Sequence, residues 1–155
     1  MIVVDASLAV KWILWERDSR AAIDFLRYHR DDLHAPDLLF TEVAQAIVRR
    51  HNEGRAAGLD IQDDAREALH KWTALWADTA VQSHRLNPHW LSEAGLMAME
   101  LGHPLQDRIY LALARELSCD LATCDAKFRA KAVDLYPDIR LLSDYDLPPV
   151  PILNI

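Results

Sequence analysis

The chain has 155 residues, of which 51% are hydrophobic, and its formal net charge is −7. This composition predicts a single domain over residues 1–155 with a full hydrophobic core, and only 4 Gly and 7 Pro argue against long linkers. The negative charge argues against a protein that coats nucleic acid, because such a protein normally presents a basic surface. It does not exclude a nuclease, since a site that holds divalent cations with several carboxylates is negative by design.

Targeting signals and cysteine usage predict the compartment. No apolar run approaches the roughly 20 residues that a membrane-spanning helix needs, and the first residues lack the features of a signal peptide. Cys119 and Cys124 show neither a zinc-type CxxC spacing nor an evident disulfide framework, and we interpret both as core thiols. We therefore expect a cytoplasmic protein without a membrane partner.

The first predicted strand ends in an acid. Residues 2–4 (Ile-Val-Val) are β-branched without polar alternation, which is typical of a strand buried on both faces. Asp5 follows directly, and ligands of open α/β sheets bind beyond the carboxyl ends of the strands. Ser7 can cap the helix that we place over residues 7–16. Taken alone, however, Asp5 is more simply explained as a capping or turn residue.

The next elements are mainly scaffold. Trp12 and Trp15 give the first helix an apolar face and are expected in the core. A second helix is predicted over residues 19–30, and a short strand over residues 34–36 ends at its proline.

A helix over residues 38–52, closed by Gly54, contains an acid in an unusual place. Glu42 lies on or beside the buried stripe of this helix, where an unpaired carboxylate is unfavourable. It therefore requires a partner, either through a functional role or through a salt bridge, for instance to Arg49.

The centre of the chain predicts two more helices and a strand. Residues 60–77 show apolar positions at helical spacing and form scaffold. A third strand is expected at residues 79–83, and a helix over residues 87–101 ends at a Gly-His-Pro break.

The last third of the chain contains two further acids. Residues 105–114 form an almost wholly apolar helix whose single acid is Asp107, for which stabilisation of the helix dipole by about 0.3–1 kcal/mol is the simple explanation. A short apolar strand then ends in Thr123-Cys-Asp125, and a last strand is expected at residues 139–142.

Alternating strands and helices predict an α/β fold, a three-layer sandwich in which helices cover a mainly parallel sheet. Asp5 and Asp125 each end a strand, whereas Glu42 and Asp107 lie near the starts of helices that begin at the same carboxyl edge. Four acids that converge there would repel one another unless cations were bound. Their hard oxygen ligands predict a Mg²⁺ or Mn²⁺ site.

Four blocks of the sequence, in order and spread over nearly the whole chain, resemble the motifs of the PIN-domain family. They are Val4-Asp5-Ala-Ser7, Glu42-Val-Ala-Gln-Ala46, Asp107-Arg-Ile-Tyr-Leu-Ala-Leu-Ala114 and Leu121-Ala-Thr123-Cys-Asp125. The chain length and Lys11-Trp12 resemble the VapC toxins of bacterial toxin–antitoxin pairs. Each block is weak alone, but the set is specific.

The resemblance implies a PIN-like sheet in which the first and fourth strands are adjacent. It implies an acidic quartet that serves as catalytic residues and metal ligands, with two supporting hydroxyls: Asp5, Glu42, Asp107 and Asp125, then Ser7 and Thr123. Arg108 departs from the pattern, because a small residue commonly follows the third acid. It could reach a phosphate or pair with a neighbouring acid, and metal affinity depends on which.

The function implied by the resemblance is that of a Mg²⁺- or Mn²⁺-dependent endoribonuclease toxin. Its substrate would be RNA, tRNA or rRNA, a cognate VapB-like antitoxin would inhibit it, and the chain would form a homodimer. The alternative is a catalytically silent PIN-type module that binds RNA or protein. Receiver modules and Asp-x-Asp phosphatases are disfavoured, because Ala6 and Ser7 stand where those sites need a further acid. A metal-independent ribonuclease needs paired histidines, and we expect most of the 7 His at the surface.

Overall fold

The structure, a computed structural model, describes residues 1–148. Its centre is a five-stranded sheet in the spatial order β3-β2-β1-β4-β5. The strands are β1 (Ile2–Val4), β2 (Leu33–Pro36), β3 (Gln82–His84), β4 (Asp120–Thr123) and β5 (Ile139–Leu141). All neighbouring strands are parallel, so the predicted mainly parallel sheet is confirmed.

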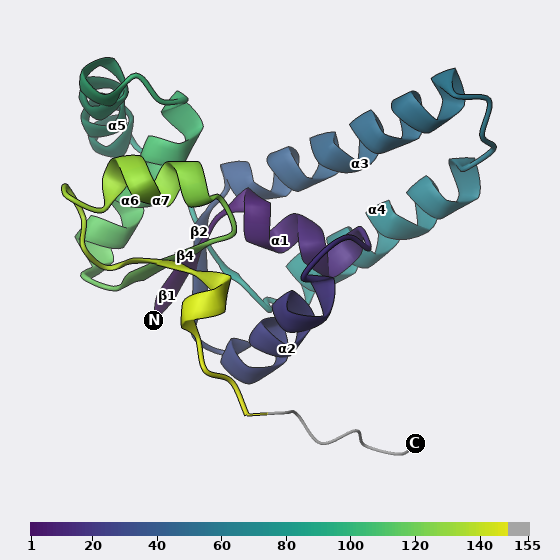
Figure 1. Cartoon of the computed structure of the whole chain (residues 1–155), viewed down its shortest axis with the longest axis horizontal. Coiled ribbons are helices and arrows are strands. Elements are labelled where there is room, and N and C mark those ends of the chain that lie inside the picture. Colours follow the sequence, from purple (N-terminus) through teal and green to yellow (C-terminus); the bar gives the residue numbers. More distant parts are fainter. Residues whose placement is uncertain (149–155) are drawn as a thin grey trace.

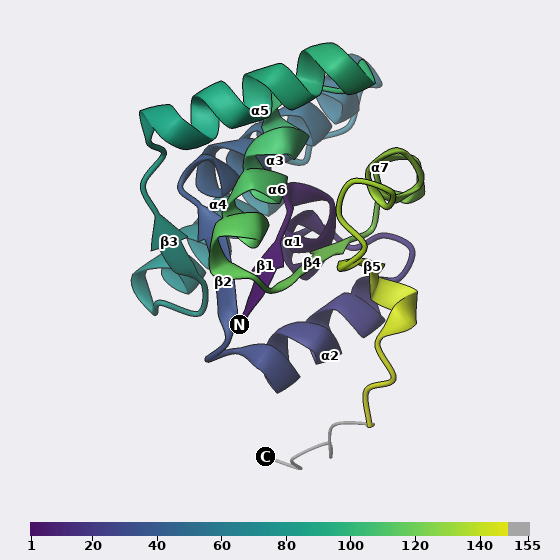
Figure 2. The ribbon, with the colours of Figure 1, turned by 90° about the vertical axis from the view of Figure 1, so that its left-hand side faces the viewer.

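Helices connect the strands because parallel strands need crossover connections. They are α1 (Ala6–Ile13), α2 (Ser19–His29), α3 (Leu38–Ala56), α4 (Gln62–Ala77), α5 (Pro88–Leu101), α6 (Leu105–Leu117) and α7 (Ala126–Ala132), followed by a short 3₁₀ helix, η1 (Leu142–Asp144). Figure 1 shows α5 and α6 on one side of the strands and α1 and α2 on the other. This is the predicted three-layer arrangement, and Figure 2 shows it turned by 90°.

β1 lies at the centre of the sheet because its side chains are apolar on both faces. Its three residues are all buried. α6 packs against β1, β2 and β4, and its residues 108–114, apolar except for Arg108 and the hydroxyl of Tyr110, are all buried. β1 pairs with β4 so that Val4 lies opposite Ala122. The two strands therefore end at the same edge, which brings the residues after them together.

Helices α3 and α4 form a hairpin that extends away from the sheet (Figure 1). At its base, Nε1 of Trp72 donates a hydrogen bond of 2.9 Å to the carbonyl oxygen of Phe40. α3 is longer than the predicted range of 38–52 because Gly54 lies inside the helix and does not end it. A Cβ atom at Gly54 would lie 2.3 Å from Cδ1 of Ile61, so glycine lets the start of α4 pack closely on α3.

Three local predictions are wrong. α1 ends at Ile13, and Trp15 therefore lies in the following loop with 73% of its surface exposed. Asp5, not Ser7, is the N-cap of α1. β3 begins later than residue 79 because Thr79 has a φ of 52° and belongs to the turn that follows α4.

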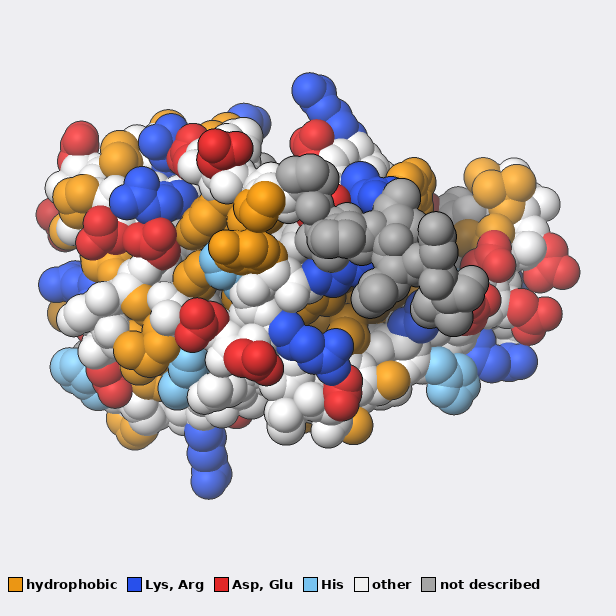
Figure 3. Space-filling view, turned by 90° about the horizontal axis from the view of Figure 1, so that it is seen from below, with side chains coloured by type: hydrophobic (Ala, Val, Ile, Leu, Met, Phe, Trp, Pro, Cys, Tyr) orange, Lys and Arg blue, Asp and Glu red, His pale blue; other side chains and the backbone are white. Residues whose placement is uncertain are grey.

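The face of the molecule seen in Figure 3 has mixed charge. On the face shown in Figure 3, acidic and basic side chains are interspersed, so the net charge of −7 is not gathered there in one patch. Within residues 1–148, none of the helices combines the length and hydropathy that crossing a membrane requires. Both cysteines are free thiols and half-buried.

Candidate active site

The carboxylate of Asp5 lies where β1 meets α1 and is held by three hydrogen bonds. The hydroxyl of Ser7 donates to Oδ1 at 2.7 Å, and the hydroxyl of Thr123 donates to Oδ2 at 2.5 Å. The backbone N–H of Leu8 also donates to Oδ1, at 3.1 Å, which makes Asp5 the helix cap. Asp5 is only 3% exposed. It therefore combines two features: it caps α1, and it is a buried carboxylate at the edge of the sheet.

Ser7 and Thr123 extend this network to α7. The backbone N–H of Cys124 donates to Oγ of Ser7 at 2.9 Å, and that of Asp125 donates to Oγ1 of Thr123 at 3.0 Å. Asp125 caps α7, its Oδ1 accepting from two N–H groups of the first turn, each at 2.9 Å. The acids at the ends of β1 and β4 are therefore joined through two hydroxyl groups.

Glu42, near the start of α3, is reached from α6 by Tyr110. The phenol O–H of Tyr110 donates to Oε2 of Glu42 at 2.5 Å, and Tyr110 is 1% exposed. Burial raises the pKa of Glu42, although the hydrogen bond from Tyr110 opposes the shift. The salt bridge to Arg49 that the sequence allowed is not among the ion pairs of residues 1–148.

Asp107 lies in the first turn of α6 beside a histidine. Nδ1 of His103 is 3.3 Å from Oδ2 of Asp107, and the His103 side chain is 9% exposed.

A second histidine, His34, is buried, and its Nδ1 lies 2.8 Å from Nε2 of His84. Most histidines were expected at the surface, and His34 and the largely covered side chain of His103 are exceptions.

Sequence reasoning missed Tyr110 and His103 as neighbours of the acids. For Tyr110 the spacing from Asp107 contains the signal, because residues three or four positions apart lie on the same face of a helix. Tyr110 follows Asp107 by three residues. His103 lies in the Gly-His-Pro break before α6, so no helical spacing indicates its position.

The four acids share one electrostatic environment. Burial raises the pKa of Asp5 to about 6, and the negative charge of Asp107 adds to this rise. Burial also raises the pKa of Asp107, with a further contribution from Asp125, while the neighbouring His103 opposes it. Apart from the contact between Asp107 and His103, none of the four has an ion-pair partner among residues 1–148. Their negative charge is therefore largely uncompensated.

This donor set fits a hard divalent cation such as Mg²⁺ or Mn²⁺, which prefers carboxylate oxygens. Carboxylates whose pKa values are raised by burial and by each other are also the groups that a cation would stabilise most. In the described residues, however, no three His, Cys, Asp or Glu side chains are already grouped closely enough to hold an ion. The residues supply the chemistry of a metal site without a preformed coordination shell.

A cleft of about 990 Å³ opens beside the acids. Glu42 and Asp125 line it together with Ser7, whereas Asp107 and the buried Asp5 are not part of its lining. Its lining also contains three basic side chains, from α1, α3 and α7: Lys11, Arg49 and Lys127. A cleft lined by both carboxylates and basic side chains suits a polyanion whose phosphate groups must approach carboxylates.

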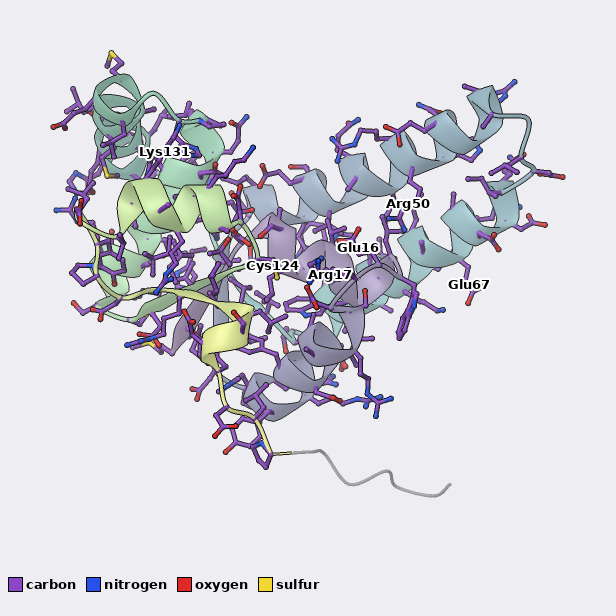
Figure 4. The ribbon with its side chains drawn as sticks, in the orientation of Figure 1. Glu16, Arg17, Arg50, Glu67, Cys124 and Lys131 are labelled. Atoms are coloured by element: carbon purple, nitrogen blue, oxygen red, sulfur yellow. The ribbon has the colours of Figure 1, made fainter. Side chains whose placement is uncertain are left out.

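One side of the cleft is held by a carboxylate that bridges two basic residues. Glu16 lies 3.0 Å from Nζ of Lys11 and 3.2 Å from Nη2 of Arg50. Figure 4 shows Glu16 and Arg50 side by side, with Cys124 farther along toward α7. These ion pairs attach the loop after α1 to α3 and so fix the position of Lys11 at the cleft.

Comparison with known proteins agrees with this geometry. The family described as PIN domain matches residues 2–134. VapC ribonuclease Mb0985 of Mycobacterium bovis is 32% identical over 127 residues, which is 82% of this chain and 87% of that protein, and ribonuclease VapC9 of Mycobacterium tuberculosis matches equally.

Solved structures share the fold at lower identity. PAE2754 from Pyrobaculum aerophilum has a TM-score of 0.65 at 20% identity, over 92% of this chain and 84% of its own. VapC20 of Mycobacterium tuberculosis, a Sarcin-Ricin loop cleaving toxin, has a TM-score of 0.65 at 15% identity, over 84% and 94%. A chain of a toxin–antitoxin complex from Klebsiella pneumoniae has a TM-score of 0.61 at 17% identity, over 92% and 98%. By the match over residues 2–134 the chain belongs to the PIN-domain family, and its mycobacterial relatives at 32% identity are VapC ribonucleases.

Proposed function

We propose that this chain is a VapC-type endoribonuclease toxin that hydrolyses RNA phosphodiester bonds with Mg²⁺ or Mn²⁺. Asp5, Glu42, Asp107 and Asp125 would be its catalytic metal ligands, and Ser7 and Thr123 would support them. The single domain would comprise residues 1–155. One observation carries this proposal: the charges of the four acids act on one another. In residues 1–148 none of these acids forms an ion pair with Lys or Arg.

The chain's own residues have separable tasks in this proposal. A divalent cation at the acids would lower the pKa of a bound water and neutralise charge on the phosphoryl group. Ser7 and Thr123 hold both oxygens of Asp5 in one orientation. Asp125 is fixed through its Oδ1 by the first turn of α7. Lys11 and Lys127, on the cleft wall, would bind phosphate groups on either side of the cut.

The names of the relatives support the proposed RNA substrate and antitoxin. The names of the mycobacterial relatives describe them as ribonucleases, and one structural neighbour cleaves the Sarcin-Ricin loop, which supports an RNA substrate of the tRNA or rRNA class. The Klebsiella pneumoniae neighbour comes from a toxin–antitoxin complex, which supports inhibition by a VapB-like antitoxin. We further propose that the protein acts in the cytoplasm as a homodimer.

Cleavage of RNA by purified, antitoxin-free protein tests this function. We expect cleavage with Mg²⁺ or Mn²⁺, none after chelation with EDTA, and none for Asp5→Asn. Asp64→Asn, at an exposed acid in the first turn of α4, is the matched control and should cleave normally. Undiminished cleavage in EDTA by both wild type and Asp5→Asn would remove the metal mechanism.

Expression in cells tests the toxin assignment and the alternative of a silent binding module. Expression should arrest growth, and a small antitoxin encoded beside the gene should relieve the arrest. Sequencing of RNA ends after brief induction, with Asp5→Asn as the control, should identify the cut site. RNA binding without cleavage under every metal condition would instead support the silent module.

A further inference from the structure

Arg108 is a buried cation directly after one of the four acids. It lies in the first turn of α6 and is 0% exposed. Its Nε, Nη1 and Nη2 atoms have no hydrogen-bond partner among residues 1–148, and it takes part in none of the ion pairs there. The structure therefore supports neither of the roles that the sequence allowed, a phosphate contact or a salt bridge.

An unpaired buried guanidinium is unfavourable and requires compensation. One source is the aromatic ring of Phe128, whose centroid lies 5.4 Å from Cζ of Arg108. Phe128 is itself fully buried in α7, the helix that Asp125 caps. Arg108 therefore connects the helix that carries Asp107 with the helix that begins at Asp125.

The second source of compensation is the negative charge of Asp107. The positive charge of Arg108 lowers the pKa of Asp107, against the larger raising effect of burial. Conversely, burial lowers the pKa of Arg108 and the negative charge of Asp107 raises it. Arginine keeps its proton in proteins, so this charge is permanent.

We propose that Arg108 is a positioning residue that acts through Asp107: its fixed, buried charge partly offsets the negative charge of the acidic quartet and weakens divalent-cation binding there. This inference rests on the proposed metal site. The same charge reduces repulsion among the acids while no cation is bound. Arg108 thus neutralises part of the negative charge that a bound cation would otherwise neutralise.

A purely structural role, in which Arg108 only fills space between α6 and α7, makes a different prediction. Removing the charge would then change the melting temperature without changing cation affinity. Titration of metal-free, full-length protein with Mn²⁺ by calorimetry separates the two roles, because it measures binding without cleavage.

Arg108→Met is the test variant, since methionine is unbranched and packs well against an aromatic ring such as Phe128. We expect it to bind Mn²⁺ about tenfold more tightly than wild type, because removing a buried unit charge that acts on a ligand carboxylate changes affinity on this order. Arg115→Met is the matched control. Arg115 is on the same helix, 43% exposed and 2.9 Å from Glu93, so the variant changes net charge equally at a solvent-screened position. Its affinity should stay within about twofold of wild type.

The outcomes are distinguishable. If wild type binds Mn²⁺ and folded Arg108→Met binds it with unchanged affinity, the proposed role of Arg108 is wrong while the metal site stands. If wild type binds no Mn²⁺, the metal site fails and this inference fails with it. Should Arg108→Met not fold, Arg108→Gln replaces it under the same criterion, and Arg108→Lys, which keeps the charge, should retain wild-type affinity.

Discussion

The hydroxyl of Thr123 donates a hydrogen bond of 2.5 Å to Oδ2 of Asp5, although 118 positions separate the two residues in the chain. Thr123 is fully buried, and its Oγ1 also accepts the backbone N–H of Asp125. One hydroxyl therefore aligns the acids that follow β1 and β4. The orientation of Asp5 depends on this long-range contact as much as on its own helix.

Thr123→Val should remove that alignment with little change in volume. It leaves a buried carboxylate oxygen and a backbone N–H without a partner, at a cost of about 1–3 kcal/mol in the free energy of unfolding. Cleavage should fall because Asp5 loses its fixed orientation. Thr73→Val is the control, since the exposed Thr73 only donates to the carbonyl of His70 within its own helix, outside the cleft lining, and it should alter neither property. Normal cleavage by Thr123→Val would show that Ser7 alone suffices.

Asp107→Asn should abolish cleavage while the metal-free protein stays at least as stable as wild type. The substitution removes a charge that raises the pKa values of Asp5 and Glu42, and hence removes like-charge repulsion. Leu113→Ala, at a fully buried position of the same helix, should instead cost about 2–5 kcal/mol through lost packing. Thermal melts in EDTA beside cleavage assays measure both. A clearly lower melting temperature with near-normal cleavage would identify Asp107 as a helix-start residue and not as a ligand.

The stability of metal-free protein should depend on pH through Asp5. Its folded-state pKa of about 6 lies above the value of roughly 3.9 for an exposed carboxyl, so the folded protein holds this proton more tightly. The resulting stabilisation is full below about pH 4 and is lost as the pH rises through about 6. Asp5→Asn has no such group. Its free energy of unfolding, relative to wild type, should therefore increase between pH 4.5 and 7.5, by at most about 3 kcal/mol.

Urea unfolding in EDTA at those two pH values measures the effect, and the comparison between variants cancels the contributions of histidines. A constant difference would mean that Asp5 titrates like an exposed carboxyl. Cation binding should weaken over the same range as the pH falls, because protons compete for Asp5.

Tyr110→Phe should test the contact between α6 and α3. It removes the hydrogen bond to Glu42, whose pKa then rises further, so both cation affinity and cleavage should fall. Tyr136→Phe is the control. The Tyr136 hydroxyl donates to the carbonyl oxygens of Ala114 and Cys119, away from the four acids, and its loss should cost about 1 kcal/mol of stability without affecting cleavage. Equal cleavage by the two variants would count against a role for Tyr110.

Lys127→Met should weaken RNA binding and its dependence on salt. In an inactive Asp5→Asn background, loss of one phosphate contact to single-stranded RNA should reduce the slope of log affinity against log salt by about 0.7. Lys71→Met, on α4 and paired with Glu67 at 2.7 Å outside the cleft lining, should leave the slope unchanged. Filter binding at several salt concentrations measures the slopes, and equal slopes would place the RNA elsewhere.

The fold class follows from the sequence pattern alone, and the same pattern singled out the four acids as site candidates. A buried parallel sheet covered by helices is favoured by two apolar segments, residues 2–4 and the helix after Asp107. The observed sheet confirms this prediction. Parallel strands end at one edge, so acids placed directly after β1 and β4 had to approach each other. The predicted ends of two helices were wrong, since α1 stops before Trp15 and α3 continues past Gly54. Tertiary contacts decide where the last turn of a helix stops.

The contacts of individual side chains, by contrast, are visible only in the folded structure. The contacts from Thr123 to Asp5 and from Tyr110 to Glu42 join residues far apart in sequence, and side-chain direction depends on packing that no local pattern encodes. Arg108 is the clearest case, since its position after an acid suggested a surface phosphate contact or an ion pair. Burial against Phe128 decided otherwise, because α7 covers this turn of α6 and leaves the guanidinium an aromatic face in place of water.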